Sequence, residues 1–387
     1  MTRLGREKSQ QARSWLGGGD LWLFLTREGS DPAARLVFDA AVSGQAAFML
    51  HRSSALALVA NYDLGHVERL GVFGETRAYE RSFAEGLAAW LRELAPERLL
   101  VNYSETDPLC DGLSHGQYLK LRRVAEDALP GVPLESSERL LSRVRGVKTD
   151  LELSRLERAV AGSGELYARL RPLLRPGQSE REIQALMLDI AADLGFAAYL
   201  GDYGGPLVCI NRVGLAHRAP GDDRLERGDL LILDHALEHA GYHSDLARTL
   251  YVRREGESGA PEPELRAFAS AHAAITAAFG AIAPGLEGWQ VDEVARRVHL
   301  DNGFPEISHA TGHQLGRHVH DGGAILGPRW ERYGSAPYGV LEPGNVFTLE
   351  PTILQTGAPS MLVEENVLVT ETGARWLSER QNELWLI

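Results

Sequence analysis

Cysteine is scarce in this chain: Cys110 and Cys209 are the only two among its 387 residues, and they lie far apart in the sequence. Two such residues form neither a disulfide framework nor a thiolate metal site, which suits a reducing cytoplasm. Long hydrophobic runs are also absent, so we expect no membrane-spanning segment. The N-terminal stretch MTRLGREKSQQARSW has no apolar core and does not resemble a secretory signal. We therefore expect a cytoplasmic protein.

Positive charge is in deficit. The chain has 40 Lys and Arg residues against 53 Asp and Glu residues, which gives a net charge of -13. Because phosphate backbones bind basic surfaces, this balance argues against a nucleic-acid partner. The zinc signature H-E-x-x-H is missing as well, which excludes a zincin-type peptidase. What the chain does contain is 44% hydrophobic residues, over a length that suits two domains.

The first third of the sequence alternates short apolar segments with helical patterns. Such alternation predicts a small α/β domain, which we place at residues 1–146. Its expected strands cover residues 21–25, 36–38, 46–50, 55–59 and 98–102, and its expected helices cover residues 79–94 and 117–128. We find no cluster of candidate ligands in this part of the sequence.

Residues 147–387 form the second predicted domain, which opens with strong helix signals. Thr149 and Glu152 form one capping box, and Ser179 and Glu182 form another, with Gly195 as the C-terminal cap of the second helix. The other elements expected here are a hairpin at residues 230–248, helices at residues 264–283 and 290–300, and strands at residues 341–351 and 361–370.

An internal echo runs through this second domain. Residues 225–234 read LERGDLLILD and residues 341–350 read LEPGNVFTLE, so each is a glycine turn that feeds an apolar strand ending in an acid. Upstream, residues 176–196 and 284–304 each start with Pro-Gly and end with Gly-Phe. The apolar positions between them also match, Ile183, Leu186 and Ile190 with Val291, Val294 and Val298. The echo predicts two equivalent halves that each deliver an acid to a shared centre.

Several acids stand where burial without a partner would be costly. Asp234 follows an apolar strand directly, and Asp245 lies near it at the base of the predicted hairpin. Glu350 ends the echoing strand, and the adjacent Glu364 and Glu365 lie in an apolar strand that points them to opposite faces. A turn residue is the ordinary interpretation of any single aspartate. For the group as a whole, a bound cation is the simplest explanation.

Histidines gather in one short segment, SHATGHQLGRHVHD, which contains four of the 13 in the chain: His309, His313, His318 and His320. Gly312 and Gly316 bracket His313 and let the backbone pass close to a ligand or another strand. On a strand, His318 and His320 would share a face. Packed structural histidines are the alternative, but this density favours metal binding or acid–base chemistry.

The predicted ligand set has four carboxylates and one imidazole: Asp234, Asp245, His313, Glu350 and Glu364. This count suits two divalent cations that share bridging carboxylates. The oxygen-rich donors favour Mn²⁺ or Co²⁺ over a structural Zn²⁺. A two-metal centre of this kind predicts hydrolysis by a metal-activated water.

These motifs resemble those of the pita-bread metallopeptidases, which include methionine aminopeptidase, aminopeptidase P and the Xaa-Pro dipeptidases (prolidases). The resemblance covers about residues 147–386. It rests on D-x10-D ending S-D-x-x-R-T (234–249), T-G-H-x-x-G with V-H-D (311–321), L-E-P (349–351) and E-x-x-V-L-V-T (364–370). It implies a mixed fold of helices and strands (α/β, in the broad sense that includes α+β). The two halves of the second domain would be related by a pseudo-twofold axis. Residues 26–32 (TREGSDP) more loosely resemble a creatinase-type N-terminal domain.

The resemblance also implies how the metal ions are held. Asp234 would bind one ion, whereas His313 and Glu350 would bind the other. Asp245 and Glu364 would bridge them. The implied cofactor is two divalent ions, Mn²⁺ first, with Co²⁺ or Zn²⁺ as alternatives. Glu350 would also serve the attacking water as general base and then as acid.

Further residues take roles by the same resemblance. His217 matches the family histidine near the scissile-bond nitrogen. His309 and His320 match the histidines that hydrogen-bond the substrate carbonyl or carboxylate. Arg248 would be an ion-pair partner rather than a catalyst. The remaining histidines of the region match nothing functional: His235, His239, His243 and His318.

Two positions depart from the family pattern. Aminopeptidase P and larger prolidases usually have Arg two residues before the metal glutamate that corresponds to Glu364. They usually have Tyr four residues after the metal glutamate that corresponds to Glu350. This chain has Leu362 and Leu354 there. Leucine can neither donate to an oxyanion nor clamp a carboxylate. We therefore expect another basic residue, from the N-terminal domain or a partner subunit, to do that work.

The leading interpretation is a dinuclear metallopeptidase that acts on short proline-containing peptides, most simply an Xaa-Pro dipeptidase. The alternative is an aminopeptidase P acting on Xaa-Pro-Yaa peptides, whereas a methionine aminopeptidase would lack the first domain. A non-catalytic binding protein on the same fold is less favoured, because all five ligands are present. We also expect a homodimer, since in relatives the N-terminal domain helps shape the cleft of its partner.

Overall fold

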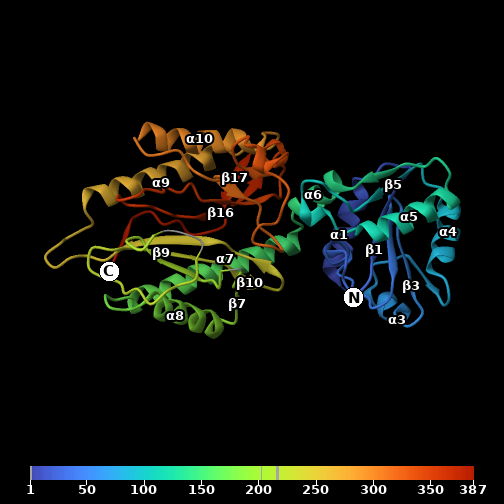
Figure 1. Cartoon of the computed structure of the whole chain (residues 1–387), viewed down its shortest axis with the longest axis horizontal. Helices are drawn as coiled ribbons and strands as arrows, with labels where there is room; N and C mark the ends of the chain where they lie inside the picture. Colours follow the sequence, from blue (N-terminus) through green and yellow to red (C-terminus); the bar gives the residue numbers. More distant parts are fainter. Residues whose placement is uncertain (1, 202, 215–217) are drawn as a thin grey trace. The chain divides into compact units, whose positions relative to one another are not determined.

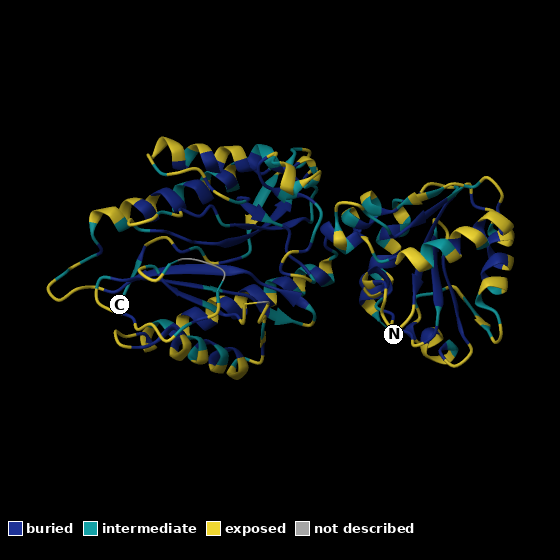
Figure 2. Cartoon of the chain, in the orientation of Figure 1, coloured by how far each residue is buried: buried dark blue, intermediate teal, exposed yellow. Residues whose placement is uncertain are grey.

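The computed structural model describes residues 2–201, 203–214 and 218–387. The chain divides into two compact units, Met1–Arg145 and Gly146–Ile387 (Figure 1). In each unit, buried strands lie among helices whose outer faces are exposed (Figure 2). Among the described helices, none is both long and apolar enough to cross a membrane.

The N-terminal unit is built on a six-stranded sheet with the order β4-β3-β2-β1-β5-β6. Its central strand β1 pairs antiparallel with β2 and parallel with β5, so the sheet is mixed. The strands are β1 (Asp20–Thr26), β2 (Ala46–His51), β3 (Ser54–Ala60), β4 (Glu75–Tyr79), β5 (Arg98–Val101) and β6 (Leu134–Ser136). The helices are α1 (Arg3–Ser14), α2 (Pro32–Phe38), α3 (Leu64–Leu70), α4 (Phe83–Leu94), α5 (His115–Ala128) and α6 (Glu138–Gly146).

Two predicted elements of this unit are wrong. Residues 36–38 belong to helix α2 and not to a strand, because the carboxylate of Asp31 accepts the N–H of Ala33 at 2.9 Å and starts a helix ahead of them. An apolar run this short does not distinguish strand from helix by itself. The helix expected from residue 79 begins only after its cap, Ser82, and Tyr79 is the last residue of β4.

The C-terminal unit has four long helices, α7 (Asp150–Leu170), α8 (Glu180–Asp193), α9 (Glu262–Ala281) and α10 (Gly288–Asp301). The main sheet contains β8 (Leu207–Ile210), β9 (Leu230–His235), β12 (Leu246–Tyr251) and β18 (Trp385–Leu386), and a second sheet contains β15 (Val346–Leu349), β16 (Glu365–Thr370) and β17 (Gly373–Trp376). The short strands are β7 (Ala197–Ala198), β10 (Leu237–His239), β11 (Tyr242–His243), β13 (Gly312–His313) and β14 (Ile325–Leu326). This mixture of helices and strands agrees with the predicted α/β class.

Two half-cores divide this unit. One packs α7 and α8 against β8, β9 and β12, and the other packs α9 and α10 against β15, β16 and β17. Figure 1 shows the two helix pairs on opposite sides of the strands. Ile183 on α8 and its counterpart Val291 on α10 are both fully buried. Val294 is 37% exposed, so the match between the two helices is limited to their inner faces.

Both predicted capping boxes are present. Thr149 accepts the N–H of Glu152, whose carboxylate accepts the N–H of Thr149 at 2.8 Å. Ser179 and Glu182 make the same reciprocal pair at the start of α8. Gly195 follows α8 with φ +78°, the left-handed conformation expected after a helix end. These caps fix where the two helices that support the first half of the unit begin.

Candidate metal centre

The predicted hairpin exists and brings two acids to one end of the main sheet. Strands β9 and β12 pair antiparallel, with Asp234 opposite Ala247. Because side chains alternate along a strand, Asp245, two residues before Ala247, faces the same side as Asp234. The buried hydroxyl of Tyr167 lies 3.0 Å from the carbonyl oxygen of Leu233 and 2.8 Å from that of Leu246. Tyr167 therefore fastens the two strands together just where they deliver their acids.

The second half of the unit docks onto β12 through main-chain bonds. The N–H of Glu364 donates to the carbonyl of Ala247 at 3.1 Å. Asn366 brackets Asp245, accepting its N–H at 3.2 Å and donating to its carbonyl at 2.6 Å. Asp245 and Glu364 thus face each other at fixed positions, although they lie far apart in the sequence.

His313 and Glu350 come from neighbouring strands of the second half. The hydroxyl of Thr348 accepts the N–H of His313 at 3.0 Å and lies 3.5 Å from Oε1 of Glu350. The N–H of Glu350 donates to the carbonyl of Thr311 at 2.7 Å. The hydroxyl of Thr348 therefore links two candidate ligands, His313 and Glu350.

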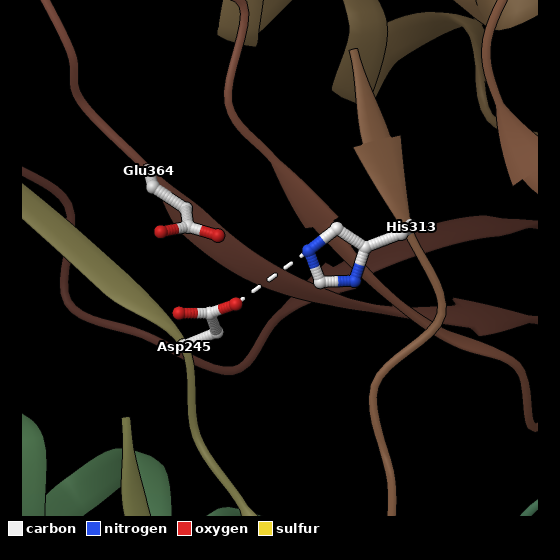
Figure 3. A group of neighbouring side chains, drawn as sticks. All are labelled: Asp245, His313 and Glu364. Atoms are coloured by element: carbon white, nitrogen blue, oxygen red, sulfur yellow. Dashed lines mark ion pairs between the residues drawn. The ribbon is translucent and has the colours of Figure 1, made fainter. Parts of the chain in front are cut away.

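The donor atoms of this site converge. One donor atom each from Asp245, His313 and Glu364 lie within 4.8 Å of one another (Figure 3). Nε2 of His313 is 3.5 Å from Oδ2 of Asp245 and 3.4 Å from Oε1 of Glu350. Asp234 shares this environment, since its charge acts on Asp245, Glu350 and Glu364. Asp245, His313, Glu350 and Glu364 thus lie in one cluster, and Asp234 is on the same face of the hairpin as Asp245.

The imidazole of His313 is held in the tautomer that a metal ion needs. Its Nδ1 lies 3.2 Å from the carbonyl oxygen of Gln314, and because a carbonyl only accepts, Nδ1 must carry the proton. Nε2 then presents its lone pair toward the carboxylates of Asp245 and Glu350. Lone pairs on both sides repel each other unless a proton or a metal cation lies between them.

The pKa values of the clustered side chains also indicate a cation site. Burial, followed by the charges of neighbouring carboxylates, raises the pKa values of Asp245 and Glu364 well above their usual range. Burial raises the pKa of Asp234 to about 6, and burial together with the charge of Asp234 raises that of Glu350 to about 8. Burial lowers the pKa of His313 to about 3. Four crowded carboxylates beside a neutral imidazole fit divalent cations in donor type and charge.

The other predicted histidines have different placements. His309 is half-buried, with Nδ1 2.7 Å from the carbonyl of Ala310. His320 is exposed and lies beside His313, with ring centroids 4.3 Å apart. His217 lies outside the described residues. The expectation that His318 and His320 share a strand face is wrong, because β13 ends at His313 and the chain turns after it.

Adjacent glutamates take the two directions that the pleat predicted. Glu364 faces the ligand cluster, whereas Glu365 forms a buried ion pair with Arg248, whose Nη2 is 3.0 Å from Oε2. Arg248 also donates to the main-chain carbonyls of Glu364 and Glu379, each at 2.7 Å. Arg248 is thus an ion-pair partner that holds the backbone of a candidate ligand.

Sequence reasoning missed a second buried network, on α10. Arg296 donates to Asp292 and to the carbonyls of Ile307 and His309, and Oδ1 of Asp292 accepts both the N–H and the hydroxyl of Thr311. Thr311, whose carbonyl accepts the N–H of Glu350, is therefore tied to the helix through its own N–H and hydroxyl. An Asp and an Arg four residues apart on an otherwise apolar helix face are the signal that could have indicated it.

The two leucines that depart from the family pattern differ in exposure. Leu362 is 8% exposed and packs with Cys209, Ile232 and Ala247, on the sheet face that carries Asp234. Leu354 is 40% exposed. A small buried apolar cluster thus lies on the sheet face that carries Asp234.

Known peptidases are similar to this chain. The profile of metallopeptidase family M24 matches residues 154–371. A relative described as "Probable dipeptidase PepE", from Mycobacterium tuberculosis, is 31% identical over 268 residues, 67% of this chain and 66% of that protein. The Xaa-Pro dipeptidase of Pyrococcus furiosus is 27% identical over 247 residues, 63% of this chain and 66% of that protein. The chain matches just under two thirds of the length of these relatives.

Solved structures extend the similarity to both units. The X-Pro aminopeptidase of Thermotoga maritima has a TM-score of 0.75 at 21% identity, covering 97% of this chain and 99% of that one. The Xaa-Pro dipeptidase of Bacillus anthracis has a TM-score of 0.75 at 21% identity, covering 99% and 100%. The expected pita-bread fold with an additional N-terminal domain is confirmed. With the profile match over more than half of the chain, the conclusion is that this protein belongs to metallopeptidase family M24.

Proposed function

We propose that this protein is a dinuclear metallopeptidase that hydrolyses Xaa-Pro dipeptides. The observation that carries the proposal is the cluster of Asp245, Glu350 and Glu364 around the Nε2 lone pair of His313, in a chain of the M24 family. Such a site has the donors for two divalent ions and, without them, a surplus of buried negative charge.

The five clustered side chains are proposed to hold the ions, and Mn²⁺ is the first candidate because most donors are carboxylate oxygens. Asp245 and Glu364 would be shared between two ions, Asp234 would serve one, and His313 and Glu350 would serve the other. When bound, such ions lower the pKa of water and polarise a carbonyl group.

Side chains of the protein are proposed to transfer protons and to bind the substrate. Glu350 is the proposed general base, because its carboxylate lies 3.4 Å from Nε2 of His313, at the candidate metal site where water would be activated. His309, whose Nδ1 lies 2.7 Å from the carbonyl oxygen of Ala310, is proposed to hydrogen-bond the substrate carbonyl or carboxylate. His320 is exposed beside His313 and is proposed to contact the substrate carbonyl or carboxylate.

An aminopeptidase P activity on Xaa-Pro-Yaa peptides is the second candidate. It is supported by the equal TM-scores to an X-Pro aminopeptidase and to an Xaa-Pro dipeptidase. Leu362 and Leu354 favour the dipeptidase, because an extended substrate needs hydrogen-bond partners for its additional peptide groups and leucine offers none.

Substrate length gives the deciding prediction. We expect kcat/KM for Ala-Pro to exceed the values for Ala-Pro-amide and Ala-Pro-Ala by about tenfold or more, the factor of one lost charge-assisted hydrogen bond. The measurement compares all three on one Mn²⁺-loaded preparation. Equal values for the tripeptide or the amide would mean that the free carboxylate is not recognised, and aminopeptidase P would become the better description.

A homodimer is the proposed assembly. The candidate ligands all lie in the C-terminal unit, so the N-terminal unit is available to shape the cleft of a second subunit and to supply the missing basic residue. Multi-angle light scattering at assay concentration should give twice the chain mass of 42.4 kDa. A mass of one chain at the concentration that gives full activity would contradict this assembly.

A further inference from the structure

A tight turn follows the histidine ligand, and we name residues 314–321 the histidine turn. The N–H of Asp321 donates to the carbonyl of Gln314 at 2.9 Å and closes it. Inside it, Oδ1 of Asp321 accepts the N–H of His318 at 3.2 Å, and the N–H of Gly316 donates to the carbonyl of His318 at 3.1 Å. Asp321 therefore holds the turn from two sides, immediately after His320.

A lysine from a remote part of the chain anchors this turn. Nζ of Lys148 lies 3.0 Å from Oδ2 of Asp321, and the two side chains are only 1% and 2% exposed. The N–H of Lys148 donates to the carbonyl of Gly344 at 2.9 Å, which ties the lysine to the turn before β15. The ion pair thus joins the histidine turn to the strand that leads to Glu350.

The turn is folded closely over the pair. A Cβ atom at Gly316 would lie 2.1 Å from Oδ2 of Asp321 and 2.9 Å from Nζ of Lys148, so only glycine fits there. The carbonyl of Gly316 accepts the N–H of His243, which fixes the turn on its other side. The pair and the turn are therefore one packed unit.

A buried ion pair of this kind is a poor source of net stability. Removing two charges from water costs several kcal/mol per ion, and apolar residues of the same volume often stabilise a fold as well or better. What the charges do provide is one defined geometry, because Lys148 can reach Asp321 only when the turn is closed.

We propose that Lys148 and Asp321 are positioning residues that set His320 against His313. With the turn closed, the two rings lie with centroids 4.3 Å apart. The pair acts through the backbone of the turn, and its effect on the reaction passes through His320. The inference rests on the proposed function in giving His320 the substrate carbonyl or carboxylate.

The test compares three variants. Lys148→Met breaks the pair. Lys148→Met combined with Asp321→Asn also removes the unpaired charge, while the amide oxygen of the new side chain can still accept the N–H of His318. Arg169→Met is the control, since it removes an exposed ion pair with Glu165 on a helix of the same unit. Each is measured for its melting temperature, for Mn²⁺ affinity by titration of the stripped protein, and for kcat and KM with Ala-Pro.

The double variant distinguishes a positioning role of the ion pair from a purely structural role. We expect it to recover most of the melting temperature lost in Lys148→Met and to bind Mn²⁺ within about threefold of the parent. Its kcat/KM should stay on the order of 10- to 100-fold low, the effect of a misplaced group. The His320 ring resonances, assigned with a His320→Asn variant, should shift in the double variant and not in Arg169→Met.

Parental kcat/KM together with unshifted His320 resonances in the double variant would overturn the proposal and leave the pair a structural role. The ring resonances need no substrate. If the parent protein fails to cleave Ala-Pro, the proposed function fails, while the shift of His320 still decides whether the pair positions that ring.

Discussion

An Asp245→Asn variant is expected to lose peptidase activity by a factor of about 10³ or more while keeping its fold, since bound cations contribute several kcal/mol to such reactions. The carboxylate of Asp245 lies in the centre of the ligand cluster, 3.5 Å from Nε2 of His313. An amide of the same shape removes its charge from both proposed ions. The backbone bonds between residue 245 and Asn366 do not involve the carboxylate, so they remain.

Activity with Mn²⁺, far-UV circular dichroism and thermal melting check this expectation. Asp222→Asn, which neutralises an 80%-exposed aspartate, is the matched control and should be fully active. A second readout comes from the metal-stripped proteins. Because burial, together with the charges of Asp234 and Glu350, raises the pKa of Asp245 and makes its carboxylate costly to keep in the stripped protein, the stripped variant should melt above the stripped parent, and Mn²⁺ should stabilise it less. Full activity in the variant, or in the stripped parent, would disprove the two-metal site.

Arg248→Met should lower the free energy of unfolding by about 3–5 kcal/mol, the cost of leaving one member of a buried ion pair behind. The side chains of Arg248 and Glu365 are 3% and 1% exposed, so water cannot replace the lost partner. The change also leaves the carbonyls of Glu364 and Glu379 without their guanidinium donors.

Urea unfolding of the metal-loaded protein measures this cost. Arg92→Met is the control, because its ion pair with Asp127 is 51% and 73% exposed and such pairs contribute about 0–1 kcal/mol. Adding Glu365→Gln to Arg248→Met should recover a large part of the loss, since the unpaired charge disappears. A loss below about 1 kcal/mol in the single variant would mean that Glu365 finds another partner.

Local patterns predicted the features of this protein that local chemistry decides. Capping boxes located the starts of α7 and α8, and an acid at the end of an apolar strand located Asp234 and Glu350. In each case a residue and its immediate neighbours contain the signal. The pseudo-twofold echo then related the two halves, because equivalent helices bury equivalent faces.

Long-range partners escaped prediction for the opposite reason. Nothing near Lys148 in the sequence indicates that it meets Asp321, and nothing near Tyr167 indicates that it joins β9 to β12. The alternation of His318 and His320 left open whether the histidine segment continues as a strand, and it does not. Alternating histidines are compatible with a strand and with a tight turn. The turn depends on close packing at Gly316, where a Cβ atom would lie 2.9 Å from Nζ of Lys148, a residue far away in the sequence.

The candidate ligands are spread along the chain from Asp234 to Glu364, whereas the N-terminal unit is one contiguous stretch. On the ribosome, that unit emerges whole before the first ligand is made and can fold early. The C-terminal unit cannot complete its main sheet until the end of the chain has been made. Until residues 385 and 386 are made and β18 pairs with β12, the outer edge of the strand that follows Asp245 is open. An open strand edge invites pairing with other chains. The interval between the synthesis of β12 and that of β18 is therefore when the nascent protein most needs a chaperone.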